Sequence, residues 1–541
     1  MHCKFLNFGG RNGVQGAGGL VHQQHLRLHG QGAGDQLGLN GSLPATCFPT
    51  AATIANSWDP ALGEEIGQYL GEEAASQGVG VLLGPGLNIK RSPLCGRNFE
   101  YFSEDPYLAG KMAAGYVRGI QKNGISACPK HFACNSQELR RMASDSVLDE
   151  RTLREIYLTG FEIAVKESHP KSIMSSYNRI NGIYANENYH LLQEILRDEF
   201  GFDGFVVSDW GASNDHVEGV RTGSHLEMST TGGDSDLELV EAVKSGRLSE
   251  DELNQRVDEL LDVILPVTEA VKKYEGKPFD IDTHHKMAAK AAGESIVLLK
   301  NEGNILPLKK GTKVAVIGEF AQKARYQGAR SSVVNPTKLD HYPLDVAGFE
   351  PGYPRSGKGD PAMQAKAVEL AKKADIVLLY ISLDEISESE GLDRAGMKLP
   401  QSQVDLIEAV SAINPNVVAV MSAGSSVEMP RLDKCKALIH GYLCGQAGAG
   451  AMLQAILGEI NPSGKLAESY PIKYEDTPSA PYFPAKQRTA EYREGLYVGY
   501  RYFETANVPV LFPFGFGLSY TSFQYSDLKV RTCIHKEKRT W

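Results

Sequence analysis

The sequence predicts an α/β protein whose first half is a (β/α)8-like (TIM) barrel. Short apolar runs alternate with helical patterns at the spacing that parallel strand–helix–strand units require. Polar residues follow almost every predicted strand, as the active-site loops of a barrel do. No Gly-x-Gly-x-x-Gly follows the first predicted strand, which weighs against a dinucleotide-binding fold. Together these observations favour a barrel over an open sheet.

The elements of this barrel can be assigned in order along the chain. Apolar residues at helical spacing predict helices over 61–77, 107–122, 148–167, 189–199, 236–246 and 250–273. Between them, short apolar runs predict strands at 79–83, 125–128, 172–176, 204–207 and 226–228. The run 205–207, Phe-Val-Val, is apolar and β-branched and follows a glycine, as expected of a buried strand.

A second α/β pattern follows residues 266–283, whose Pro, Gly and Lys content predicts a surface linker. Helices are expected at 284–292, 362–373, 402–413 and 448–458, and strands at 295–301, 313–317, 374–381 and 416–421. This alternation favours layers with helices on both faces of a sheet. The glycine-rich run 445–450 lacks the Lys-Ser/Thr of a phosphate-binding loop, so we interpret it as tight strand-to-helix packing.

The composition excludes several functional classes. The chain has 541 residues, 42% hydrophobic and 23% charged, with a formal net charge of −10, which argues against a nucleic-acid binder. No apolar run approaches the roughly 20 residues that span a bilayer. The eight cysteines form no Cys-x-x-Cys pair, so we expect no metal, no cofactor and no dense disulfide framework. No signal peptide is visible, which predicts a cytoplasmic protein. Assembly into a homo-oligomer is possible.

The first 34 residues differ from the rest of the chain. They are rich in Gly, Gln and His, contain no acidic residue, and show no sustained period of 2 or 3.6. A flexible tail, a poorly ordered terminus and out-of-frame coding would each explain this irregular N-terminal segment. We favour out-of-frame coding.

The loops after the predicted strands carry the chemistry. They hold Arg97, Lys130, His131, Arg141, Tyr177, Asp209 and Trp210. Each has an ordinary explanation by itself, and Asp209 alone could cap a helix that begins near residue 213. Together, many fixed donors around one carboxylate are what binding several sugar hydroxyls requires.

These motifs resemble family 3 glycoside hydrolases, specifically the β-glucosidase branch. The resemblance runs from about residue 34 to 521 and rests on 44–49 (Pro-Ala-Thr-Cys-Phe-Pro), the Arg97 loop, 130–132 (Lys-His-Phe) and 207–210 (Val-Ser-Asp-Trp). It implies that Asp209 is the nucleophile and that Trp210 stacks on the sugar. The side chains implied to contact the sugar in the first subsite are Arg97, Lys130, His131, Arg141 and Tyr177.

A retaining glycosidase also needs a second carboxyl group as acid/base, roughly 5–5.5 Å from the nucleophile. By composition, the acidic loop 383–394 is most simply a solvated surface segment. Its Glu-Gly-Leu-Asp-Arg at 390–394 resembles the family's Glu-Gly-x-Asp-Arg, which implies Glu390 as acid/base, with Glu388 as second choice. Ser331 matches a family loop that reaches the sugar, although Arg330 stands where Gly is usual.

The resemblance also divides the chain into domains. It implies a barrel domain at 35–265, the linker at 266–283, an α/β sandwich at 284–520 and a remnant of a fibronectin-III-like domain at 521–541. The family's Asp-Gly-Pro-x-Gly motif and its first strand and helix are not found before residue 44, where 25–31 read His-Leu-Arg-Leu-His-Gly-Gln. We therefore expect a barrel that is incomplete at its N-terminus.

The expected function is that of a retaining, exo-acting β-glucosidase that releases terminal β-D-glucose from small-molecule carbohydrates. β-Xylosidase or α-arabinofuranosidase activity on the same scaffold is an alternative. An inactive, truncated sugar-binding relic is another. The β-N-acetylglucosaminidase branch is disfavoured because its loop after Lys-His-Phe is Gly-rich and carries a catalytic His, whereas 133–136 here read Ala-Cys-Asn-Ser. Neither a nucleic-acid nor a membrane partner is expected.

Overall fold

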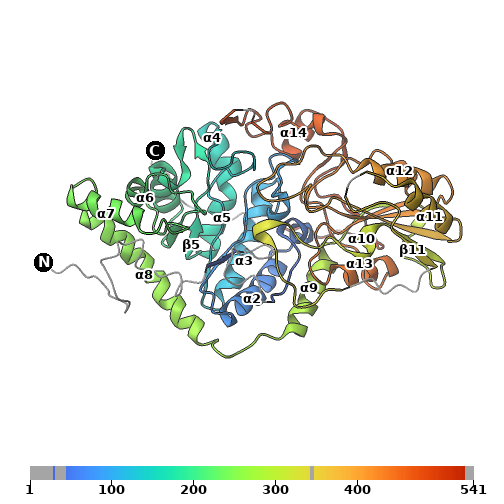
Figure 1. Ribbon diagram of the computed structural model, residues 1–541, viewed down its shortest axis with the longest axis horizontal. Coiled ribbons are helices and arrows are strands. Elements are labelled where there is room, and N and C mark those ends of the chain that lie inside the picture. The colour runs from blue at the N-terminus through green and yellow to red at the C-terminus, as the bar shows by residue number, and fades with distance from the viewer. Residues whose placement is uncertain are drawn as a thin grey trace.

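The computed structural model describes residues 28–30, 44–340, 347–356, 358–485, 487–524 and 526–530. Figure 1 shows two halves side by side, both built from helices and strands. The helices between residues 60 and 272 gather in the first half, and those between residues 319 and 505 in the second. Helix α9, Ile281–Ser295, lies between them. The chain is therefore an α/β protein.

The strands of the first half pair in parallel. β1 (Leu28–Gly30) pairs with β2 (Val81–Leu83), and β2 with β3 (Ser126–Ala127). β5 (Ser172–Met174) pairs with β8 (Phe205–Val207). Single parallel bridges, Phe132 to Ser175 and Val207 to Leu226, extend this pairing. Because all these strands run the same way, the loops at their carboxyl ends gather on one side.

Two sequence predictions about these strands need correction. Residues 28–30, predicted to be irregular, form β1, since pairing with β2 uses backbone groups and needs no apolar period. The rest of 1–34, including most of the 25–31 stretch, lies outside the described residues. The predicted strand 226–228 is reduced to one bridge at Leu226, because the chain turns away after a single paired residue.

Helices α2 (Pro60–Ser76) and α3 (Pro106–Gln121) confirm the predictions at 61–77 and 107–122. Each begins with Asp-Pro: the aspartate side chain caps the first turn and the proline occupies its first position, where no amide donor is needed. The two helices pack closely through glycines. A Cβ on Gly67 would lie 2.4 Å from the carbonyl oxygen of Tyr116, so no larger residue fits there.

The other helices of the first half follow the predicted order, except α1, which was not predicted. They are α1 (Ala51–Ile54), α4 (Glu150–Thr152) continued through a π-helical segment (Leu153–Leu158) into α5 (Thr159–Ser168), a π-helix (His190–Glu199), α6 (His216–Thr222), α7 (Asp234–Lys244) and α8 (Glu250–Lys272). Along α8 the buried residues recur at helical spacing and face the strands.

The predicted linker over 266–283 is too long at its start. Helix α8 continues through Pro266 to Lys272, and only residues 273–280 connect it to α9. The buried side chains of Val263, Val267 and Ala270 hold the helix against the first half on both sides of the proline. This packing outweighs the backbone hydrogen bond that Pro266 cannot donate.

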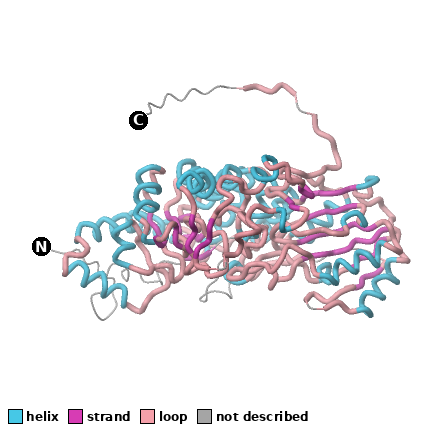
Figure 2. Tube along the Cα trace, turned by 90° about the horizontal axis from the view of Figure 1, so that it is seen from above, coloured by secondary structure: helices cyan, strands magenta, loops and turns pink. Residues whose placement is uncertain are grey.

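The second half is built on one six-stranded sheet, in the order β11-β10-β12-β13-β14-β9. Figure 2 shows strands of this sheet lying side by side, with helices next to them. In chain order the strands are β9 (Val297–Asn301), β10 (Val314–Ile317), β11 (Gly348–Glu350), β12 (Ile376–Ser382), β13 (Val417–Ser422) and β14 (Ala437–His440). All pairs are parallel except β9 with β14. The accompanying helices are α10 (Glu319–Gln322), α11 (Pro361–Ala371), α12 (Gln401–Ser411), α13 (Gly448–Leu457) and α14 (Tyr500–Thr505).

The glycine-rich run before α13 serves packing, as the sequence predicted. A Cβ on Gly445 would lie 2.5 Å from the carbonyl oxygen of Cys47, and one on Gly448 would lie 2.3 Å from the Cβ of Cys444. Gln446 is fully buried and accepts a hydrogen bond from the backbone N–H of Cys47. This run therefore joins the two halves of the chain.

The sequence did not predict the short strands that tie the carboxyl-terminal region to the first half. β16 (Thr489–Glu491) pairs with β4 (Asp145–Val147) in a four-stranded sheet completed by β6 (Arg179–Ile180) and β7 (Ile183–Tyr184). A further pair joins β15 (Tyr470–Pro471) to β17 (Val510–Phe512). Among the described residues, no helix is long and apolar enough to cross a membrane.

Candidate active site

The predicted site residues of the first half lie in the loops at the carboxyl ends of the parallel strands. Arg97 follows β2, Lys130 and His131 follow β3, Tyr177 follows β5, and Asp209 and Trp210 follow β8. All of them except Trp210 are buried, and Trp210 is half-buried. The structure therefore gathers on one side of the first half the side chains that the sequence placed at separate strand ends.

Asp209 lies at the centre of this group. Its Oδ1 accepts a hydrogen bond from the backbone N–H of Trp210 at 2.7 Å, and its Oδ2 lies 3.6 Å from Nε2 of His131. No described residue donates a hydrogen bond to that buried Oδ2. Burial raises the pKa of the Asp209 carboxyl, while Arg97, Arg141 and Lys130 act against this rise. Asp209 is thus a buried carboxylate with one oxygen left for another group.

The structure rules out Asp209 as the cap of the next helix. Helix α6 begins at His216, and the side chain of Asp215 caps it by accepting a hydrogen bond from the N–H of Glu218 at 3.0 Å. Asp209 therefore plays no part in starting that helix.

Two buried cations are held in place by Glu100, which the sequence analysis did not single out. Its Oε2 lies 2.7 Å from Nη2 of Arg97, and its Oε1 lies 3.0 Å from Nζ of Lys130. A short helical turn, Asn98–Glu100, follows Arg97 directly and brings the two side chains together. Since all three groups are almost fully buried, this carboxylate fixes both cations beside Asp209.

His131 is held as a neutral imidazole. Burial lowers its pKa well below the usual range, and the nearby Arg97, Lys130 and Arg141 lower it further. Its Nδ1 lies 3.2 Å from Oδ1 of Asn88, which leaves Nε2 facing Asp209. The ring therefore presents a fixed polar edge to the site.

Arg141 and Tyr177 form one wall of the site. The guanidinium carbon of Arg141 lies 4.8 Å from the centre of the Tyr177 ring, a cation–π distance. Burial raises the pKa of the Tyr177 hydroxyl, and Asp209 raises it further, so the tyrosine stays protonated. Arg141 lies in a turn between β3 and β4, and its side chain packs on the Tyr177 ring from there.

Glu390 reaches the same arginines from the second half, in the loop after β12. Its Oε1 lies 2.9 Å from Nη2 of Arg141 and 3.7 Å from Nη1 of Arg97. Its Oε2 accepts hydrogen bonds from the backbone N–H, at 3.1 Å, and the hydroxyl of Ser331. Burial raises the pKa of Glu390, but the two arginines and Ser331 outweigh burial and lower it to about 2. Without a bound ligand, Glu390 is therefore ionised.

Glu388, the second choice for the acid/base, points into the protein instead. Its carboxylate accepts from Nη1 of Arg325 at 2.5 Å and from the N–H of Gly424 at 2.8 Å. It is 2% exposed, and burial of its charge is offset by Arg325 and Arg394, which lower its pKa. Glu388 is therefore part of a closed ion cluster.

Replacing Glu388 should consequently reduce stability. We expect Glu388→Ala to lower the free energy of unfolding by about 3–5 kcal/mol, because it leaves the fully buried Arg325 without its counter-charge. Urea unfolding followed by tryptophan fluorescence would measure the loss. Glu385→Ala is the matched control, since Glu385 pairs with Arg355 at the surface and should cost less than about 1 kcal/mol. Equal losses in both variants would contradict this assignment.

Hydrogen bonds to the carboxylates of Glu138 and Asp393 hold the loop that carries Glu390 against the first half, and neither residue was predicted to have this role. Glu138 accepts from the N–H of Gly391 at 2.6 Å and from Nη1 of Arg141 at 2.7 Å. Asp393 in turn accepts from the N–H groups of Glu138 and Leu139 at 3.0 and 2.8 Å. The only signal for Glu138 in the sequence is its position three residues before Arg141, which is too common to carry a prediction.

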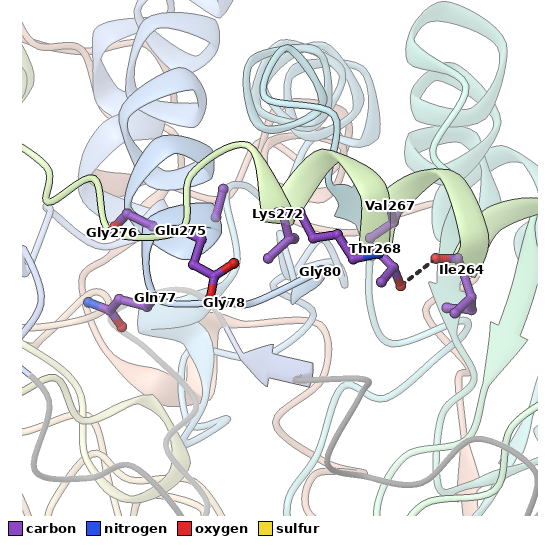
Figure 3. Close-up of a pocket in the computed structure, with 12 residues that line it drawn as sticks. Gln77, Gly78, Gly80, Ile264, Val267, Thr268, Lys272, Glu275 and Gly276 are labelled. Atoms are coloured by element: carbon purple, nitrogen blue, oxygen red, sulfur yellow. Dashed lines mark hydrogen bonds between the residues drawn. The ribbon is translucent and has the colours of Figure 1, made fainter. Parts of the chain in front are cut away.

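One separate cavity lies away from this site (Figure 3). It has a volume of about 340 Å³ and lies between the end of α2 and the second half of α8, with Gly78, Gly80 and Thr268 in its lining. Gly80 directly precedes β2, so the cavity lies at the amino end of that strand, opposite the site. Among the described residues, no group of His, Cys, Asp or Glu side chains could hold a metal ion.

Two carboxylates supplied by different loops and surrounded by fixed donors are the arrangement used by glycoside hydrolases. Two family models match the chain: the Glycosyl hydrolase family 3 N terminal domain over residues 31–263 and the Glycosyl hydrolase family 3 C-terminal domain over residues 296–520. The chain belongs to glycosyl hydrolase family 3.

Several relatives are closely similar over most of the chain. The thermostable β-glucosidase B of Acetivibrio thermocellus is 51% identical over 502 residues, covering 91% of this chain and 66% of the relative. The exo-α-(1→6)-L-arabinopyranosidase of Bifidobacterium breve is 44% identical, covering 91% and 67%. The chain thus spans about two thirds of the length of these curated relatives.

Solved structures are similar as well. The crystal structure of a Bifidobacterium adolescentis GH3 β-glucosidase matches with a TM-score of 0.88 at 43% identity, covering 92% of this chain and 73% of that one. The β-glucosidase 3B of Thermotoga neapolitana in complex with glucose matches with a TM-score of 0.85 at 36% identity, covering 92% and 75%.

Proposed function

We propose that the protein is a retaining, exo-acting β-glucosidase that releases terminal β-D-glucose. The observation that carries this proposal is that Asp209 and Glu390 come from different halves of the chain and depend on the same two arginines. Glu390 pairs with Arg97 and Arg141, and both arginines act against the rise in the pKa of Asp209. The β-glucosidase names of similar proteins support glucose as the sugar.

In the proposed mechanism, Asp209 attacks the anomeric carbon with its free Oδ2, and Glu390 protonates the departing oxygen. Glu390 then takes a proton from water, which attacks the glycosyl ester and releases the sugar with net retention. The buried donors Arg97, Lys130, His131 and Arg141 would bind the sugar hydroxyls, and Tyr177 would lie beside Asp209. Trp210 would stack on the apolar face of the sugar, and Ser331 would reach it from the second half.

This mechanism requires Glu390 to gain a proton when the sugar binds. In the unliganded protein Arg97 and Arg141 keep its pKa at about 2, so it is ionised near neutral pH. Sugar hydroxyls that accept hydrogen bonds from Arg97 and Arg141 would weaken the ion pairs between these arginines and Glu390. The pKa of Glu390 would rise as a result. Binding should therefore take up a proton.

We expect glucose binding at pH 6.5 to take up as much as one proton per molecule, because Glu390 changes from ionised to protonated. Calorimetry in two buffers of different ionisation enthalpy measures this number. In Glu390→Gln the uptake should vanish while binding remains. Equal uptake by Glu390→Gln and the unaltered protein would show that another group takes the proton.

A second candidate is α-L-arabinopyranosidase activity, because a relative that is 44% identical carries that name. A panel of nitrophenyl glycosides carrying β-D-glucose, β-D-xylose, α-L-arabinofuranose and α-L-arabinopyranose tests both. We expect the highest kcat/KM on the β-D-glucoside. Glucose binding without turnover of any substrate would instead favour an inactive sugar-binding relic.

We further propose that the first half forms a TIM-like barrel over 35–265 and that 284–520 form an α/β sandwich domain. The parallel pairing of β1, β2, β3, β5 and β8 and the six-stranded sheet support this division. A fibronectin-III-like segment at 521–541 and a cytoplasmic location stay predictions, and a homo-oligomer stays possible. Residues 531–541 lie outside the described part of the chain.

A further inference from the structure

Exposed apolar side chains lie on the two loops that carry Arg141 and Glu390. They are Met142, 52% exposed, Leu392, 43% exposed, and Leu139, 40% exposed. Met142 packs against Gly211, the residue after Trp210, since its Cε lies 3.4 Å from the position of a Cβ on Gly211. The N–H of Leu139 donates to Asp393, the neighbour of Leu392. We call Trp210, Met142, Leu139 and Leu392 the apolar rim.

Arg330 stands at the end of the apolar rim. It precedes Ser331, which holds Glu390, and its Nη1 lies 3.3 Å from the position of a Cβ on Gly391. Its side chain is exposed, and its φ of +69° is left-handed, a conformation that costs most side-chain-bearing residues of order 1 kcal/mol or more. The sequence therefore places a long cation where glycine would fit the backbone best.

The positive charge of Arg330 has no opposite charge paired with it among the described residues. Within the described part of the chain, no carboxylate lies within 4.0 Å of its guanidinium. The carboxylates nearby are engaged elsewhere: Glu390 with Arg141, Arg97 and Ser331; Glu138 with Arg141 and Gly391; Asp393 with backbone N–H groups; and Glu388 with Arg325. Among the described residues, an exposed arginine without an ion-pair partner thus lies beside exposed apolar side chains.

The position of this surface indicates its occupant. If Glu390 protonates the departing oxygen, as proposed above, the leaving group must extend from the sugar past Glu390. Gly391 and Leu392 follow Glu390 directly in the chain, and the guanidinium of Arg330 packs on Gly391. An apolar surface is suited to an apolar leaving group, and an unpaired guanidinium to a carboxylate or phosphate on it.

We propose that the apolar rim and Arg330 form a subsite for the leaving group, which favours an apolar aglycone that carries a negative charge. This inference rests on the proposed function and adds the class of substrate. A glucoside of a hydroxybenzoate-type phenol has these properties: an aromatic ring that lies on the rim and a carboxylate within reach of Arg330.

The test compares two glucosides that differ in charge, 4-carboxyphenyl and 4-carbamoylphenyl β-D-glucoside. The measured quantity is the ratio of their kcat/KM values, so that differences in expression or overall activity cancel. We expect Arg330→Gly to lower the ratio roughly two- to fivefold, the range for exposed ion pairs. Glycine fits the left-handed backbone at this position, so the variant should fold.

Arg330→Lys keeps the charge and should keep most of the ratio, whereas Arg330→Gln should lose it. Arg151→Gln, an exposed arginine on α4, is the matched control and should leave the ratio unchanged. Added salt should lower the ratio in the unaltered protein but not in Arg330→Gly, because the effect is electrostatic.

Separate outcomes distinguish the inference from the proposed function. Hydrolysis of both glucosides with the same ratio in the unaltered protein and in Arg330→Gly would overturn the charged subsite alone. Hydrolysis of neither would overturn the proposed function, and the subsite with it.

The apolar rim has its own test. Met142→Ser should lower kcat/KM on the aryl glucosides more than on methyl β-D-glucoside. Equal effects on both would refute an apolar surface under the leaving group.

Discussion

Asp209→Ala should abolish turnover of β-D-glucosides, with a loss on the order of 10⁴- to 10⁶-fold in kcat, as when a nucleophile is removed from other enzymes. The structure explains why no other carboxylate should replace Asp209 as the nucleophile. Oδ2 of Asp209 is a buried carboxylate oxygen that forms no ion pair with a described lysine or arginine, whereas the carboxylate of Glu100 is held by Arg97 and Lys130. Release of nitrophenol from a nitrophenyl β-D-glucoside measures the loss in kcat.

Azide gives this prediction a positive readout. The alanine leaves space beside the anomeric carbon, so azide should restore turnover in Asp209→Ala and yield the glucosyl azide of inverted configuration. Asp215→Ala is the matched control, because Asp215 caps α6 and should affect stability but not chemistry. Full activity in Asp209→Ala would exclude it as the nucleophile.

Glu390→Ala should give a different pattern, in which the loss depends on the leaving group. A general acid contributes typically 10²- to 10⁴-fold, and mainly for leaving groups that need a proton. We therefore expect a loss of about that size on methyl glucoside or a disaccharide, and a much smaller one for the first step with a dinitrophenyl glucoside. Because Arg141 and Ser331 would lose their partner, some loss of affinity should accompany the change.

The measurement is kcat/KM across a series of aryl glucosides of increasing phenol pKa. The unaltered enzyme should show a shallow dependence and Glu390→Ala a steep one. Glu388→Ala serves as control, since its carboxylate is enclosed by Arg325 and should change stability without changing the slope. An equal loss on all substrates in Glu390→Ala would contradict its role as acid/base.

Much of the fold could be predicted because the helices of the first half have clear local signals in the sequence. Asp-Pro starts α2 and α3, and apolar residues recur along them at helical spacing. The strands of the four-stranded sheet could not be predicted. β4 and β6 have only two or three residues, and β16, which pairs with β4, lies far along the chain, so no local pattern marks them.

The same distinction applies to the site. Lys130, His131 and Asp209 directly follow apolar strands, so their place at one edge could be inferred from order alone. Glu100 and Glu138 could not, because their roles come from ion pairs that exist only in the folded chain. The predicted linker failed at Pro266 for a related reason: packing of α8 against the strands overrides the local signal of a proline.

Covalent trapping tests the central claim most directly. A 2-deoxy-2-fluoroglucoside with a dinitrophenyl leaving group should form a glycosyl enzyme that hydrolyses slowly, because the fluorine destabilises the charged transition state. We predict that digestion and mass spectrometry will find the fluoroglucosyl group on the peptide that contains Asp209, and that Asp209→Ala will not be labelled. A label on another residue, or the same labelling of Asp209→Ala, would contradict the assignment of Asp209 as the nucleophile.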